Sequence, residues 1–293
     1  FDQAYWTMSP EYVESVWWSL KEIWKKGLLV QDHRVAPYCP RCGTGLSDHE
    51  LAQGYETVTD PSVFIRFPIT SGELVDLKAS LLVWTTTPWT LPSNTALTVG
   101  AKIKYSVVST FNQYTHQFTN VVLASELIGK VISGNYSEVN SKSDLKYDSS
   151  VDKKIPFLIA AHCKGSDLLE IRYEQLLDYA TPDAGVANAF RVIAGDFVTT
   201  EDGTGIVHTA PTFGADDAKV AAAATPEVPP MLVKDATDNL VPLVDLQGKF
   251  IQGLGDYSGK YVKNEYYNHG EAPERSADVE IAIQLKEENK AFK

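Results

Sequence analysis

The most constraining stretch of the sequence is an apolar run, Leu81–Trp84, that ends abruptly in Thr85-Thr-Thr-Pro-Trp-Thr-Leu-Pro-Ser-Asn94. Its apolar residues favour a buried β-strand. Pro88 and Pro92 fix their own φ and push the residues before them, Thr87 and Leu91, towards extended geometry. We therefore expect a rigid extended loop that presents a row of hydroxyls and the Asn94 amide. Such groups suit the ribose or ester oxygens of a ligand better than a metal ion. The alternative is a loop that merely caps the strand.

A second polar stretch lies about 120 residues later, in Asp202-Gly-Thr-Gly-Ile-Val-His-Thr-Ala-Pro211 and Phe213-Gly-Ala-Asp-Asp217. The first part predicts a strand, and alternation places Ile206 and His208 on one of its faces. A helix is expected to begin near Asp216. A histidine at a strand end can be a hydrogen-bonded core residue as well as a site residue. Aspartates that open a helix usually serve its dipole.

The remaining patterns predict an α+β fold, a β-barrel decorated by short helices. Period-two apolar alternation begins near residue 55, and the polar stretch 134–154 is expected to be an exposed insertion. Ser9-Pro10 opens a helix that Gly27 ends, and a last helix is predicted over 276–290. We expect a stem from the two chain ends. The predicted division is 1–54 for the N-terminal stem, 55–270 for the barrel and 271–293 for the C-terminal stem helix.

Charge and composition exclude several classes of protein. Net charge is −12, with 26 basic against 38 acidic residues, so a protein that coats long stretches of nucleic acid is disfavoured. No apolar run is long enough to span a bilayer, and no signal peptide is visible. Three cysteines do not make a disulfide framework, which favours a reducing, cytoplasmic setting. Both ends look cut from a longer chain.

Cys39-Pro-Arg-Cys42 is a turn of the zinc-knuckle kind. A structural zinc needs four ligands, and this segment supplies two thiolates. Cys163 stands alone far downstream, and His49 is the only nearby imidazole. We read the turn as half of a site, with no metal at the candidate active site.

The two polar stretches together resemble a known family. Trp-Thr-Thr-Thr-Pro-Trp-Thr-Leu-Pro-x-Asn and Gly-Thr-Gly-x-Val-His-x-Ala-Pro with Gly-x-Asp-Asp are similar to the two editing motifs of isoleucyl-tRNA synthetases, in the same order. The resemblance covers nearly the whole chain apart from the polar insertion. The related valyl and leucyl enzymes carry Thr-Thr-Arg-Pro-Glu or -Asp where this chain has Thr-Thr-Thr-Pro-Trp, which favours the isoleucyl type. The His-Ile-Gly-His and Lys-Met-Ser-Lys-Ser peptides of the aminoacylation domain are absent.

The resemblance implies an excised editing domain (connective peptide 1) that hydrolyses valine from mischarged tRNA(Ile). It implies no cofactor, with zinc at Cys39 and Cys42 only if a second ligand pair from the rest of the enzyme is present. The expected partners are the 3′ aminoacylated end of tRNA(Ile) and the remaining domains of the synthetase, with no membrane and a monomeric state. A non-catalytic module that only grips the tRNA end is the alternative, as is an editing domain of the valyl or leucyl type.

Roles for single residues follow from the resemblance and from the chemistry of the substrate. Asp217 would bind the α-ammonium group, the threonines would hold ribose hydroxyls and order a water, and His208 would form a wall of the side-chain pocket. No Gly-x-Ser-x-Gly elbow is present, so water attack without a covalent intermediate is expected. The predicted catalytic residues are Thr85, Thr86, Thr87 and Asp217. The predicted substrate-binding residues are Trp84, Thr90, Asn94, His208, Thr209 and Asp216.

Overall fold

The computed structural model describes residues 6–31 and 34–293, and the chain divides into two compact units, 1–34 and 35–293. The first unit contains helix α1 (Pro10–Lys25), which confirms the predicted N-terminal helix. Ser9 Oγ accepts a hydrogen bond from the Tyr12 N–H at its start. Gly27, with a φ of +68°, lies just beyond its end. Within this unit α1 leaves Trp17, Trp18 and Trp24 exposed.

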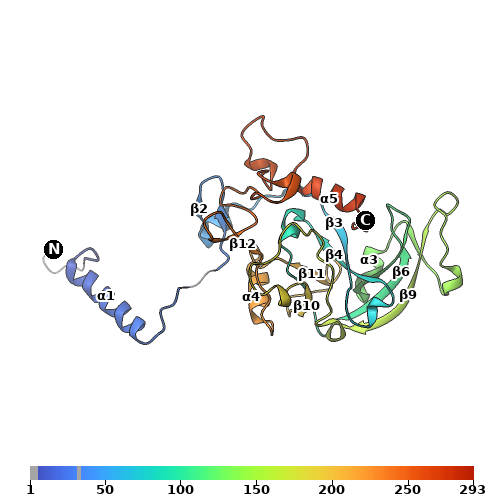
Figure 1. The fold of residues 1–293 in the computed structure, drawn as a ribbon, viewed down its shortest axis with the longest axis horizontal. Helices are drawn as coiled ribbons and strands as arrows, with labels where there is room; N and C mark the ends of the chain where they lie inside the picture. The colour runs from blue at the N-terminus through green and yellow to red at the C-terminus, as the bar shows by residue number, and fades with distance from the viewer. Residues whose placement is uncertain (1–5, 32–33) are drawn as a thin grey trace. The chain divides into compact units, whose positions relative to one another are not determined.

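A six-stranded sheet forms the main body of the second unit (Figure 1). Its strands run in the order β3-β4-β7-β6-β9-β8. The β4/β7 and β9/β8 pairs are parallel and the other neighbours antiparallel. The strand bounds are β3 Val63–Pro68, β4 Ala79–Thr85, β6 Lys104–Phe111, β7 Phe118–Ala124, β8 Tyr136–Glu138 and β9 Ile155–Lys164.

A smaller three-stranded sheet, β10-β5-β11, carries the second polar stretch. Its strands are β5 Ala96–Val99, β10 Arg191–Ala194 and β11 Ile206–Thr209. Helix α4 (Ala215–Ala223) follows β11, and Ala221 of this helix packs with Ala96 and Ile193 of the sheet. The remaining elements are the hairpins β1 Tyr38–Cys39 with β2 Thr44–Gly45 and β12 Leu232–Lys234 with β13 Leu240–Pro242, and the helices α2 Asp48–Gln53, α3 Ile128–Val131 and α5 Ala277–Glu287.

The predicted β-barrel is wrong, because the main sheet does not close. Its edge strands β3 and β8 do not pair with each other among the described residues. The C-terminal segment covers the outer edge of β3 instead. Phe292 N–H donates to the Phe64 carbonyl across 2.7 Å, and Arg66 N–H donates to the Lys290 carbonyl across 2.8 Å. Covering an edge strand satisfies its backbone groups without closure of the sheet. Mixed α+β with several sheets is therefore the fold class.

The polar stretch 134–154 is not wholly an exposed insertion. It contributes β8, which pairs with Ile155–Phe157 of β9 and forms one edge of the main sheet. Tyr136 of β8 is buried and stacks on Phe292, with ring centroids 6.0 Å apart. This buried ring packs the short strand against the C-terminal segment, although the surrounding sequence is polar.

The C-terminal helix predicted over 276–290 is confirmed as α5, with Ser276 Oγ accepting from the Val279 N–H. Because the units 1–34 and 35–293 are described separately, a stem joining the two chain ends stays a prediction, as do the domain boundaries at 54 and 270. No helix in the described part of the chain is long and apolar enough to cross a membrane.

Candidate active site

Strand β4 ends at Thr85, and the chain then turns into a 3-10 helix, Pro88–Ser93. The expectation of an extended loop is therefore wrong for Leu91, which lies inside this helix. Pro88 occupies its first position, where a missing N–H costs nothing and the fixed φ suits helical geometry. The prolines thus stiffen a tight helical turn rather than an extended segment.

The three threonines after Trp84 face different environments. Thr85 is buried, Thr86 is exposed and Thr87 is half-buried. Thr85 Oγ1 accepts a hydrogen bond from the Thr87 N–H across 3.1 Å, which closes the turn after the strand. Only part of the predicted row of hydroxyls, Thr86 and Thr87, is thus available to a ligand.

His208 joins the two polar stretches. It lies in β11, which pairs antiparallel with β5, so that Thr209 stands opposite Ala96 just beyond the threonine segment. One ring nitrogen, Nε2, is 3.0 Å from Thr90 Oγ1, and the other, Nδ1, is 2.8 Å from Asn94 Nδ2. The two stretches, separated by more than a hundred residues, therefore meet at one imidazole.

The imidazole of His208 is neutral at physiological pH. His208 is half-buried, and desolvation lowers its pKa to about 4, because a charged ring loses hydration there. Both ring nitrogens have partners, and neither partner carries a charge. A neutral, doubly hydrogen-bonded ring is held in one orientation.

Asn94 is buried, with 1% of its surface exposed, and its amide is fully engaged. Its Oδ1 accepts a hydrogen bond from the Tyr173 hydroxyl across 2.7 Å. Its Nδ2 donates to the Ala96 carbonyl across 2.8 Å as well as facing His208. The role predicted for Asn94, a contact to ribose hydroxyls, stays a prediction.

The two aspartates at the start of α4 differ in environment. Asp217 is half-buried, and its Oδ2 accepts a hydrogen bond from the Ala210 N–H across 2.9 Å. Burial raises the pKa of Asp217, against the opposing effect of that hydrogen bond. Asp216 is exposed, with Oδ1 3.3 Å from Lys219 Nζ. The less hydrated Asp217 carboxylate is the one that gains most from a bound cation.

Three further residues complete the geometry. Trp84 is half-buried and packs near Phe64, with ring centroids 6.4 Å apart. Thr209 is fully buried, and its hydroxyl lies 2.6 Å from Thr98 Oγ1, so it ties β11 to β5. Trp89 meets Phe213 edge to face at 4.8 Å, which joins the first stretch to the loop before α4. The substrate-binding roles predicted for Trp84 and Thr209 stay predictions.

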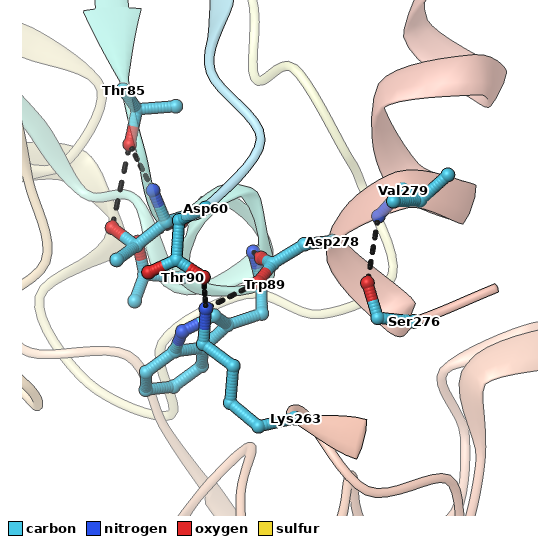
Figure 2. A network of polar contacts seen from close by, with 9 residues as sticks. Asp60, Thr85, Trp89, Thr90, Lys263, Ser276, Asp278 and Val279 are labelled. Carbon is cyan, nitrogen blue, oxygen red and sulfur yellow. Dashed lines mark hydrogen bonds and ion pairs between the residues drawn. The ribbon is translucent and has the colours of Figure 1, made fainter. Parts of the chain in front are cut away.

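Two contributors escaped the sequence analysis, Tyr173 and Asp278. Asp278, at the start of α5 and 1% exposed, accepts from the Trp89 N–H across 2.8 Å (Figure 2). Lys263 Nζ donates to Asp278 Oδ2 across 2.7 Å and to Asp60 Oδ1 across 2.8 Å. This network ties the backbone of the 3-10 helix to α5 through Asp278. Neither residue lies in a recognisable motif, so no local sequence signal could have revealed them.

The cysteine pair lies apart from this site, at the β1–β2 hairpin. Cys42 N–H donates to Cys39 Sγ across 3.3 Å, and Gly43 N–H donates to the Cys39 carbonyl. Over residues 6–31 and 34–293, no group of three or more Cys, His, Asp or Glu side chains is placed to hold a metal ion. Two thiolates alone do not fit a structural zinc. A cavity of about 400 Å³ lies against α5, between Tyr179, Lys260 and Gln284, and contains none of the predicted site residues.

Comparisons with known proteins agree with the two motifs. The sequence model of the family "tRNA synthetases class I (I, L, M and V)" matches residues 1–251. An isoleucine–tRNA ligase of Cytophaga hutchinsonii is 47% identical over 100% of this chain and 27% of its own length. One from Bacteroides fragilis is 44% identical over 99% of this chain and 26% of its own length.

Among solved structures, the editing domain of the cytosolic leucyl-tRNA synthetase of P. knowlesi aligns with 57% of this chain and 63% of its own, at 15% identity and a TM-score of 0.39. The chain spans about a quarter of the length of the curated relatives named above. From the family match over residues 1–251, the chain belongs to the class I tRNA synthetases of the isoleucine, leucine, methionine and valine group.

Proposed function

We propose that this chain is an editing module that hydrolyses the ester of mischarged valyl-tRNA(Ile), by water attack and without a covalent intermediate. The observation that carries the proposal is the position of His208, held between Thr90 and Asn94 where the two motifs meet. A folded site that unites both motifs supports a joint role for them.

The need for such a site follows from the limits of binding. A missing methylene changes affinity by only ~1–3 kcal/mol, and isoleucine against valine is the usual illustration of that limit. A synthetic site for isoleucine therefore accepts some valine. A second site that removes the smaller amino acid from the tRNA restores accuracy.

Asp217 is the proposed partner of the α-ammonium group of the substrate. Its Oδ2 is used by the Ala210 N–H, while its Oδ1 accepts no hydrogen bond from the residues that the structure describes. The side chain is only half-buried, so a ligand can reach it. A charge-assisted bond there would restore the stabilisation that the carboxylate loses through burial.

The threonines would order the ribose and the attacking water. Thr86 is exposed and Thr87 half-buried, whereas Thr90 is buried and donates its proton to the Thr87 carbonyl across 2.9 Å. Among the described residues, Thr90 supplies the hydroxyl that contacts His208. A buried hydroxyl that donates its proton to a carbonyl is a poor nucleophile. This favours a positioned water over an acyl-enzyme.

The proposed partners are the 3′ aminoacylated end of tRNA(Ile) and the other domains of a full-length synthetase, with the chain acting as a monomer. A net charge of −12 suits contact with the end of a tRNA rather than with its whole length. Bulk binding of the tRNA would then fall to the rest of the enzyme.

A deacylation time course tests the proposal. The full chain, residues 1–293, is mixed with valyl-tRNA(Ile) and with isoleucyl-tRNA(Ile), and release of the amino acid is followed. We expect release of valine and little release of isoleucine. Binding of the charged tRNA without hydrolysis would mean a non-catalytic module. Faster hydrolysis of mischarged tRNA(Val) or tRNA(Leu) would assign the domain to the valyl or leucyl type.

A further inference from the structure

The hydrogen-bond chain through His208 has a direction that can be read from its ends. On the Nε2 side, Thr90 Oγ1 donates its only proton to the Thr87 carbonyl across 2.9 Å. A carbonyl oxygen can only accept, so the Thr90 hydroxyl is the donor in this contact. With its proton on that carbonyl, the Thr90 hydroxyl accepts a hydrogen bond from His208 Nε2, which lies 3.0 Å away. Nε2 must carry the ring proton.

The Nδ1 side gives the same answer independently. The Ala96 carbonyl, 2.8 Å from the Asn94 amide, requires the NH2 group on its side. The Tyr173 hydroxyl donates to the opposite end, Oδ1, across 2.7 Å. The amide nitrogen therefore faces His208 Nδ1 at 2.8 Å and donates to it. Nδ1 must be an acceptor without a proton.

Asn94 cannot reverse its amide to suit a protonated ring. Reversal would set Oδ1 against the Ala96 carbonyl, two acceptors in contact, and would lose the Tyr173 bond. With 1% of its surface exposed, Asn94 has no access to water that could compensate. An imidazolium would thus place two donors, Nδ1–H and the amide, against each other.

We infer that Asn94 is a positioning residue that locks His208 in the neutral tautomer protonated on Nε2, so that neither ring nitrogen has a free lone pair to accept a proton from water. The imidazole then serves as a rigid wall and not as a general base. Tyr173 orients Asn94 through the hydrogen bond from its hydroxyl to Asn94 Oδ1. The consequence for amino-acid selection rests on the proposed function, whereas the tautomer itself does not.

The first test needs no variant. The full chain contains six histidines, and ¹⁵N labelling of histidine with His208→Gln as an assignment reference identifies the His208 signals. We expect one proton-bearing Nε2 and one unprotonated Nδ1 at pH 7, unchanged on titration to pH 5. A ring protonated on Nδ1, or one that titrates between pH 5 and 7, would overturn the lock.

Asn94→Asp tests the cause. A carboxylate can only accept, so Nδ1 must then carry a proton, and a nearby negative charge raises the pKa of the ring by about 1–3 units. We expect His208 to titrate at least about one unit higher than in the wild type. Asn120→Asp is the matched control, because Asn120 is also a buried amide whose Oδ1 accepts from a hydroxyl and whose Nδ2 donates to a carbonyl. An equal change of His208 in Asn120→Asp would overturn the assignment to Asn94.

If Asn94→Asp does not fold, Thr90→Val tests which residue sets the position of the ring proton of His208. It removes the acceptor of the Nε2 proton but leaves Asn94 in place, so the Nε2 tautomer is expected to persist. A switch to the Nδ1 tautomer would mean that Thr90, and not Asn94, sets the proton position. Deacylation of valyl-tRNA(Ile) is measured on the same samples. A wild-type chain with the expected tautomer but no deacylation would defeat the proposed function alone, and the reverse result would defeat the lock alone.

Discussion

Asp278 in α5 accepts a hydrogen bond from the backbone N–H of Trp89 across 2.8 Å, although 189 positions separate the two residues. Trp89 lies in the 3-10 helix that follows the threonines, and Asp278 lies in the first turn of the C-terminal helix α5. The buried carboxylate also holds Lys263. The threonine turn is therefore fastened to the end of the chain.

Asp278→Ala is expected to destabilise the fold strongly. Removing one partner of a buried ion pair typically costs ~3–5 kcal/mol, and the loss here should be near the lower end because Lys263 keeps Asp60. Urea unfolding measures the change. Glu280→Ala on the same helix is the control, since its pair with Lys260 is partly exposed and worth about 0–1 kcal/mol. Equal losses for both variants would contradict a special role for Asp278.

Asp217→Asn is expected to abolish most deacylation of valyl-tRNA(Ile) without loss of stability. Truncating a charged partner costs ~2–5 kcal/mol, which corresponds to about 30-fold or more in rate. The amide oxygen of Asn can still accept from the Ala210 N–H, so the fold is retained. Asp178→Asn, at an exposed position outside both motifs, is the control. A folded Asp217→Asn variant with wild-type activity would refute the role of Asp217.

The pH dependence of stability has a defined sign at Asp217. Because burial raises its pKa, the folded state binds a proton more tightly than the unfolded state. The contribution of Asp217 to stability is therefore most favourable below the unfolded pKa of about 3.9 and declines as pH rises through the folded pKa. Asp217→Asn should equal or exceed the wild type in stability at pH 7 and lose that advantage near pH 4. Thermal unfolding at both pH values checks this.

Thr85 and Thr86 are expected to respond oppositely to alanine substitution. Thr85→Ala leaves the Thr87 N–H without its acceptor inside the turn and should cost about 1–3 kcal/mol of stability. Thr86→Ala removes an exposed hydroxyl and should change stability by less than about 0.5 kcal/mol, while it slows deacylation. Unfolding and deacylation are measured side by side. Wild-type deacylation by Thr86→Ala would favour the view that the threonines only cap the strand.

His208→Ala is expected to begin hydrolysing correctly charged isoleucyl-tRNA(Ile) while it retains most activity on valyl-tRNA(Ile). Burial alone favours the larger isoleucine side chain over valine. Exclusion of isoleucine from the pocket therefore needs a rigid wall, because overpacking a close-packed site costs ~1–3 kcal/mol. Time courses on both charged tRNAs measure the effect. His162→Ala, an exposed histidine bonded to Ser106, is the control. Loss of valyl-tRNA(Ile) hydrolysis without any hydrolysis of isoleucyl-tRNA(Ile) would contradict the proposal that His208 forms a wall of the pocket.

Chelators are expected to leave the melting temperature of the full chain unchanged. Cys39 and Cys42 supply two ligands, and a structural zinc that contributes to folding needs four. Thermal unfolding with and without EDTA, together with elemental analysis, tests this. One zinc per chain, lost together with the fold on chelation, would contradict the expectation.

Local sequence alone determined the elements on which the site stands. Ser9 and Ser276 begin helices because a hydroxyl at that position accepts from a free backbone N–H, a purely local contact. The apolar run before Thr85 became β4, and the motif around His208 became β11. The motifs likewise pointed to the family, because each is a contiguous string of side chains.

Only the tertiary structure decided how those elements close and which polar groups face a ligand. The barrel failed because the C-terminal segment, more than two hundred residues away in sequence, pairs with the edge of β3. Asn94 turned inward because Tyr173 and Ala96 satisfy its amide there. Such outcomes depend on contacts between residues far apart in sequence, and the local periodicity of the chain does not encode which distant group will satisfy a given hydrogen-bonding atom.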